Sequence, residues 1–218
     1  MKRITIFAGH YGSGKTNIAV NTALKMKKEG KDVVIADLDI VNPYFRTKDS
    51  LDRLEKAGIK LISSEYANSN VDIPAIPQDM YSVVDDKTHY YIVDLGGDDR
   101  GAYALGRYSD KIKEEDSFEF IFVFNKYRPL TPDAESAIEV MREIETACNM
   151  KFTAIVNNSN IGDLTDASAV LTSVPESDKL SLLTGLPVKY TSAEKSLCER
   201  LEAFPGELFP LELQSKII

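Results

Sequence analysis

The segment that most constrains this chain is Gly9–Thr16, which reads GHYGSGKT and matches the phosphate-binding pattern G-x-x-x-x-G-K-[ST]. A short apolar run precedes it, and a helical pattern begins near Lys15. Because glycines let successive backbone N–H groups turn toward one point at the positive end of that helix, we expect a nucleotide phosphate there. The predicted nucleotide-binding residues of this loop are Gly9, Gly12, Ser13, Gly14, Lys15 and Thr16.

Two side chains of the loop have distinct expected roles. Lys15 is the predicted bridge between the β- and γ-phosphates, and Thr16 is the predicted hydroxyl ligand of Mg²⁺. We expect the Lys15 side chain to face solvent while the site is empty.

Apolar runs alternate with amphipathic segments along all 218 residues, and no linker divides them. This pattern predicts an α/β fold, a single three-layer P-loop domain over residues 1–218, whose mostly parallel sheet of about seven strands is flanked by helices. The expected strands are 3–8, 32–37, 59–63, 89–94, 118–124, 152–156 and 187–190. The expected helices are 15–28, 44–56, 78–84, 101–114, 132–147 and 166–183, with Thr131 as an N-cap before Pro132 and Pro175 kinking or splitting the last one.

The charge balance argues against some partners. The chain has 26 basic and 34 acidic residues, a net charge of −8, which gives no overall attraction for nucleic acid or anionic lipid. No apolar run reaches the length of a membrane span, and the N-terminus enters a strand without a cleavage-type segment, so we expect a cytoplasmic protein. Cys148 and Cys198 form no C-x-x-C pair and are expected to be inert thiols.

Acidic and glycine residues follow two of the expected strands. Ligands bind at the carboxyl ends of strands in sheets of this kind, so these residues are candidates for the site. Asp37 and Asp39 point the same way from a strand and suit a hydrated Mg²⁺ and an attacking water. Asp94 ends another apolar strand as a Walker-B type candidate, and the Gly97 amide is a candidate sensor of the γ-phosphate.

Residues at two further strand ends indicate which nucleotide base the chain binds. Asn157 presents a donor and an acceptor that match the N6/N7 edge of adenine. The segment Asn125–Arg128 begins like the guanine-binding pattern N-K-x-D but has Arg128 in place of the aspartate. Since arginine cannot accept the protons of guanine N1 and N2, adenine and therefore ATP is favoured over GTP.

The loop, the Asp37–Asp39 and Asp94–Gly97 segments and the Asn157 strand end resemble, in order and approximate spacing, the MinD/ParA/CobQ-type nucleotide-binding proteins over nearly the whole chain. The resemblance implies that Asp37 contributes to magnesium hydration and that Asp39 positions the water. It further implies that Asp94 and Gly97 form a second switch and that Asn157 reads adenine. Lys15, Asp39 and Asp94 are thus the candidate catalytic residues, and Thr16, Asp37 and Asp94 the candidate metal ligands.

The chain departs from this family at His10. The family places a lysine directly after the first glycine of the loop, where it reaches into the partner subunit of an ATP-sandwiched dimer. Histidine is shorter and mostly neutral at pH 7. Two alternatives stay open: the nucleotide-dependent homodimer is kept and another cation replaces the lysine, or the dimer is lost. Candidate cations are Arg46, Lys48, Arg100 and Arg128.

Three functional readings follow. The leading one is a slow Mg²⁺-dependent ATPase whose switch loops regulate a partner protein, for example in metallocentre maturation or positioning. The second is an ATP-dependent phosphotransferase or ligase acting on a small molecule held by residues 42–46 or 125–128. The third is a nucleotide-sensing scaffold with little hydrolysis, which the histidine at position 10 favours.

Overall fold

The computed structural model describes residues 2–38, 50–63, 78–97, 99–115, 117–201 and 203–213, with the side chains of Gln78, Asp99 and Arg100 excepted. Its centre is a sheet of eight strands in the order β3-β2-β4-β1-β5-β6-β7-β8, and all pairings are parallel. The strands are β1 (Ile4–Ala8), β2 (Val33–Leu38), β3 (Lys60–Ser63), β4 (Tyr90–Leu95), β5 (Phe118–Phe124), β6 (Ala154–Asn157), β7 (Val188–Glu194) and β8 (Leu208–Leu211).

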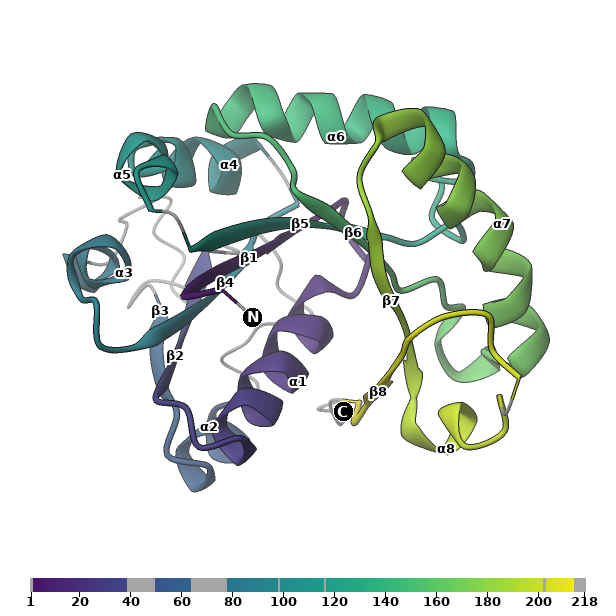
Figure 1. Cartoon of the computed structure of the whole chain (residues 1–218), viewed down its shortest axis with the longest axis horizontal. Coiled ribbons are helices and arrows are strands. Elements are labelled where there is room, and N and C mark those ends of the chain that lie inside the picture. Colours follow the sequence, from purple (N-terminus) through teal and green to yellow (C-terminus); the bar gives the residue numbers. More distant parts are fainter. Residues whose placement is uncertain are drawn as a thin grey trace, which may run out of the picture.

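Helices cover both faces of this sheet, as Figure 1 shows. They are α1 (Lys15–Lys28), α2 (Leu51–Lys56), α3 (Tyr81–Asp85), α4 (Asp99–Gly106), α5 (Ser109–Lys113), α6 (Ala134–Cys148), α7 (Ala167–Thr184) and α8 (Lys195–Cys198), with short 3-10 turns at Gln78–Met80 and Gly162–Leu164. Crossover helices on both faces are what a parallel sheet requires. The predicted α/β class is therefore confirmed, with eight strands instead of about seven.

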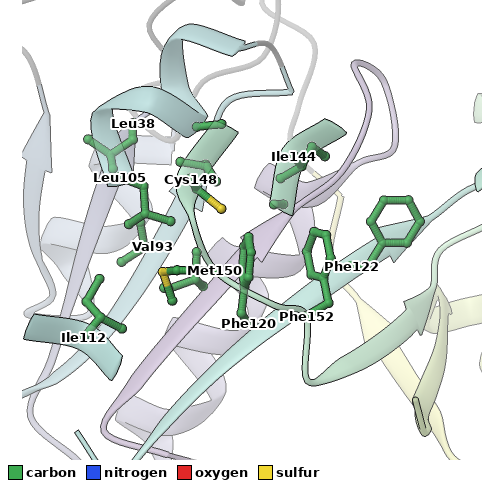
Figure 2. Packing of buried hydrophobic residues seen from close by; sticks show 14 of the residues in the cluster. Leu38, Val93, Leu105, Ile112, Phe120, Phe122, Ile144, Cys148, Met150 and Phe152 are labelled. Atoms are coloured by element: carbon green, nitrogen blue, oxygen red, sulfur yellow. The ribbon is translucent and has the colours of Figure 1, made fainter. Parts of the chain in front are cut away.

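Each face has its own apolar core. Strand β1 is buried throughout, and its alternation sends Ile4 and Ile6 into one core and Phe7 into the other. The first core lies under α3 to α7 and includes Phe152 stacked on Phe120 with ring centroids 4.1 Å apart (Figure 2). The second lies under α1 and α2. A central strand held from both faces gives the loop that follows it a rigid base.

Several predicted boundaries need correction. The helix predicted at 101–114 is two helices, α4 and α5, and the helix predicted at 166–183 is the single helix α7, which Pro175 does not split. Helix α6 begins at Ala134 and its N-cap is Asp133, whose carboxylate accepts from the Ser136 N–H at 2.8 Å, instead of Thr131. The Thr131 hydroxyl donates to the Asn125 carbonyl at 2.7 Å. Of the helix predicted at 44–56, residues 44–49 lie outside the described residues, and the rest is α2.

Both cysteines are free thiols. Cys148 is buried in the first core (Figure 2), and Cys198 is half-buried. Burial raises the pKa of each thiol above its usual value, which disfavours the reactive thiolate.

Candidate functional site

The loop between β1 and α1 lies at the carboxyl edge of the sheet, next to its central strand. Gly12 and Gly14 have φ of 77° and 85°, left-handed conformations that glycine adopts without a steric penalty. The Ser13 N–H donates to the His10 carbonyl at 3.0 Å, which closes the turn. Gly14 is the N-cap residue of α1, so the loop delivers its backbone directly into the positive end of that helix. This is the geometry of an anion-binding loop.

Lys15 and Thr16 form the first turn of α1. The Lys15 side chain is 2% exposed and Thr16 is 4% exposed, so the prediction that Lys15 faces solvent in the empty site is wrong. The burial is a tertiary property of a helix that packs on β1, β2 and β4.

Asp37 and Asp94, the two acidic residues among the candidate metal ligands, lie opposite each other on neighbouring strands. Asp37 of β2 and Asp94 of β4 are register partners, and Asp94 is also the partner of Phe7 at the end of β1. Opposed residues of adjacent strands project to the same face of the sheet, about 5 Å apart. Both carboxylates are buried, at 7% and 0% exposed. Carboxylate and hydroxyl oxygens, such as those of Asp37, Asp94 and Thr16, are of the type that Mg²⁺ prefers. Asp39 lies outside the described residues.

Gly97 lies directly against the loop. A Cβ added to Gly97 would stand 2.7 Å from both the Gly9 carbonyl oxygen and the Tyr11 nitrogen. Only glycine fits such an approach, so the segment after β4 can contact the first half of the loop through its backbone. The structure thus brings the predicted second switch to the predicted phosphate site.

Two residues that follow β5 and β6 hold the second half of the loop. Arg128 donates from Nε to the Gly12 carbonyl at 2.7 Å, and Asn158 donates from Nδ2 to the Ser13 carbonyl at 2.7 Å. The Asn158 Oδ1 in turn accepts from the Ser192 hydroxyl of β7 at 2.8 Å. A Cβ on Gly14 would collide with the Asn158 amide. Sequence reasoning missed Asn158; its place directly after a strand end was the available signal.

Asn157 occupies a different environment from the one expected. Its side chain is 0% exposed; Nδ2 donates to the hydroxyls of Ser173 at 2.8 Å and Thr191 at 3.4 Å, and Oδ1 accepts from the amide and hydroxyl of Ser159. An asparagine amide has two donor hydrogens and two acceptor lone pairs, so all of them are used. The predicted base-reading role of Asn157 does not agree with this arrangement, in which the amide joins β6, β7 and α7.

The segment that begins like a guanine-binding motif is also built into the domain. Asn125 is fully buried, and its Oδ1 accepts from the Tyr127 N–H at 3.0 Å and the Asn160 N–H at 3.2 Å. Its Nδ2 donates to the Asn160 carbonyl at 3.3 Å. Asn125 thus ties the loop after β5 to the loop after β6.

His10 is half-buried, and its imidazole turns back onto the loop. Its Nδ1 lies 3.0 Å from the Tyr11 carbonyl oxygen, and because a carbonyl only accepts, Nδ1 carries the hydrogen of this bond. The next side chain, Tyr11, is 49% exposed. The imidazole therefore bonds within its own loop.

The fold and this loop define a P-loop nucleotide-binding domain. Residues 4–184 match the model of the CobQ/CobB/MinD/ParA nucleotide binding domain, and the chain belongs to that family. The predicted family resemblance is thereby confirmed. A search of curated proteins found no match.

Solved structures share the fold at low sequence identity. FtsY of Thermotoga maritima is 16% identical with a TM-score of 0.57, and the match covers 87% of this chain and 61% of that one. Chloroplast FtsY of Physcomitrella patens is 17% identical with a TM-score of 0.56, and the match covers 88% of this chain and 58% of that one. The signal recognition particle receptor FtsY of Elizabethkingia anophelis in complex with GDP is 19% identical with a TM-score of 0.52, and the match covers 88% of this chain and 57% of that one. This chain therefore matches only about three fifths of the length of these proteins, and the likeness concerns the fold alone.

Among the described residues, no helix combines the length and the apolar character needed to cross a bilayer.

Proposed function

We propose that this chain binds Mg²⁺-ATP and hydrolyses it slowly, and that the bound nucleotide sets the conformation of the segments after β2 and β4 to control contact with a partner protein. The observation that supports the proposal is the strand register: Asp94 is the partner of Asp37 and also of Phe7, which lies near the end of the strand that leads into the loop with Gly14, Lys15 and Thr16. Residues of these types at one sheet edge suit a nucleotide polyphosphate with its metal ion.

Each group has a defined task in this proposal. The loop N–H groups and Lys15 bind and orient the phosphates, and Thr16, Asp37 and Asp94 would hold the metal. Mg²⁺, when bound, supplies charge neutralisation at the phosphate oxygens. Asp39 positions the attacking water. The Gly97 N–H senses whether a γ-phosphate is present, since Gly97 lies against Gly9 and Tyr11 of the loop.

ATP is preferred over GTP in this proposal because the guanine-binding pattern N-K-x-D needs an acceptor aspartate at sequence position 128, where this chain has an arginine, and arginine has no acceptor. One structural neighbour is a GDP complex, so the preference needs a direct test. ATP and GTP are to compete for the wild-type protein against a fluorescent nucleotide, with and without Mg²⁺. We expect tighter ATP binding that depends on Mg²⁺; tighter GTP binding would contradict the base assignment.

Turnover separates the remaining functions. We expect slow hydrolysis by the protein alone, unchanged by a panel of small metabolites. Acceleration by one metabolite would identify a phosphotransferase or ligase instead. Tight ATP binding without measurable turnover would identify a nucleotide sensor, a role favoured by the inward-turned His10 imidazole.

A further inference from the structure

We propose that Arg128 is a phosphate ligand supplied by the same chain, and that its two Nη groups bind the polyphosphate of the bound nucleotide. This inference rests on the proposed nucleotide binding and deepens it, because it names the cation that compensates for histidine at position 10. Of the four candidate cations, Arg46 and Lys48 lie outside the described residues, as does the Arg100 side chain.

The guanidinium of Arg128 lies against the phosphate loop. Its Nε donates to the Gly12 carbonyl at 2.7 Å, and both Nε and the guanidinium carbon lie 3.1 Å from where a Cβ of Gly12 would stand. Because Gly12 has no side chain, nothing from that residue separates the guanidinium from the loop backbone. A phosphate bound by the N–H groups of this loop therefore lies within reach of the Nη atoms.

The backbone of Arg128 is held in a hydrogen-bonded turn. Its N–H donates to the Asn125 carbonyl at 3.2 Å, and its carbonyl accepts from the Thr131 N–H at 3.0 Å. Asn125 is itself fully buried and bonded to Asn160. The arginine is thus presented from a fixed position, which lowers the entropy cost of binding a ligand.

The charge of Arg128 is left available for a ligand. Within the described part of the chain, Nε is its one bonded nitrogen and no carboxylate forms an ion pair with it, whereas Arg3 pairs with Glu115 and Arg53 with Glu212. The Gly12 contact needs Nε alone, so four N–H donors on the two Nη atoms remain. A planar guanidinium with two such groups suits bidentate binding of phosphate.

A purely structural alternative is that Arg128 only fixes the loop. The two roles differ in their dependence on the ligand: a loop clamp affects ADP and the ATP analogue alike, because the loop binds phosphates of both, whereas a ligand of the outer phosphates matters more for the ATP analogue than for ADP. The test compares wild type, Arg128→Ala, Arg128→Lys and the control Arg142→Ala, an exposed arginine of α6. Calorimetric titrations use AMP, ADP and a non-hydrolysable ATP analogue with Mg²⁺, and thermal unfolding of each variant reports on the fold.

We expect Arg128→Ala to weaken binding of the ATP analogue by about 10- to 100-fold, a typical loss for a hydrogen bond to a charged group. AMP affinity should change by less than about threefold, Arg128→Lys should recover part of the loss by restoring the charge, and Arg142→Ala should match wild type. Equal losses for ADP and the ATP analogue, no loss at all, or a lysine variant as weak as the alanine variant would each overturn the inference. Failure of the wild type to bind any of the three would instead refute the proposed function.

Discussion

Asn158 donates its side-chain amide to the Ser13 carbonyl, 145 positions earlier in the chain, and accepts from Ser192 on β7. The phosphate loop is thus tied to a strand on the far side of β6. This bond satisfies a carbonyl at the turn into α1, next to Gly14. The shape of the loop therefore depends on a residue outside the phosphate-binding pattern.

We expect Asn158→Ala to lower the free energy of unfolding by about 1–3 kcal/mol, because it leaves buried polar groups without their partner. Nucleotide affinity should fall as well, since the loop loses a brace. Urea unfolding and ADP titration measure the two effects. Asn160→Ala, which removes a half-buried amide bonded to the Asn158 carbonyl, is the matched control and should have the smaller effect on affinity.

Lys15→Ala should abolish measurable Mg²⁺-ATP binding, with an affinity loss of roughly a hundredfold or more. Because Lys15 is buried, the variant must be shown to fold by thermal unfolding before its affinity is interpreted. Lys28→Ala removes an exposed lysine from the other end of α1 and should bind as wild type. Undiminished calorimetric affinity in a folded Lys15→Ala protein would refute the role of the loop.

Asp39→Ala and Asp94→Asn should reduce turnover much more than binding, because groups that position water and metal act mainly in the transition state. We expect turnover to fall by about a hundredfold or more while ATP affinity stays within about threefold. Single-turnover kinetics and calorimetry on the same preparations separate the two quantities. Parallel losses of affinity and turnover, as expected for Lys15→Ala, would show that the roles are assigned incorrectly.

Asp86, at the edge of the sheet opposite the phosphate loop, should make the free energy of unfolding depend on pH in the acidic range. Hydrogen bonds from the Thr88 hydroxyl and amide and from Tyr91 hold the pKa of its carboxyl well below the usual value. A lowered folded-state pKa gives stability that is present above the unfolded pKa of about 4 and lost as pH falls toward the folded value. The stability difference between wild type and Asp86→Ala should therefore be largest near pH 7 and shrink below about pH 4. Urea unfolding of the two proteins between about pH 3 and pH 7 measures this difference.

His10→Lys tests the dimer. If the sandwich geometry of the family survives, the restored lysine should produce turnover that rises with protein concentration, and light scattering should detect a dimer in Mg²⁺-ATP. A charge-stabilising residue at such a site is typically worth about 10³–10⁵ in rate. No gain, with a monomer still present in ATP, would show that the dimer is lost and would favour a partner-activated or sensing role.

Some of the fold could be predicted because local patterns specify it. In the apolar run of β1, the glycines of the loop and the helical pattern of α1, the local sequence preference agrees with the tertiary fold. Helix α1 was predicted with its observed bounds, Lys15–Lys28. Edge elements carry a weaker pattern: β8, four residues that pair with β7, was not predicted. Pro175 breaks no helix because α7 packs on α6 and the sheet, and this packing outweighs local propensity.

The sequence by itself determined the phosphate loop, the family and the strand ends that carry Asp37 and Asp94, since each is written in a short contiguous pattern. Tertiary structure decided which of two adjacent asparagines meets the loop. Asn157 turns into a hydrogen-bond network with Ser173 and Thr191, and Asn158 reaches Ser13. It also buried Lys15 and placed Arg128 on Gly12. These outcomes depend on contacts between separate segments, 16 positions apart in the Asn157–Ser173 bond and 116 in the Arg128–Gly12 bond, and local sequence patterns carry no record of such pairings.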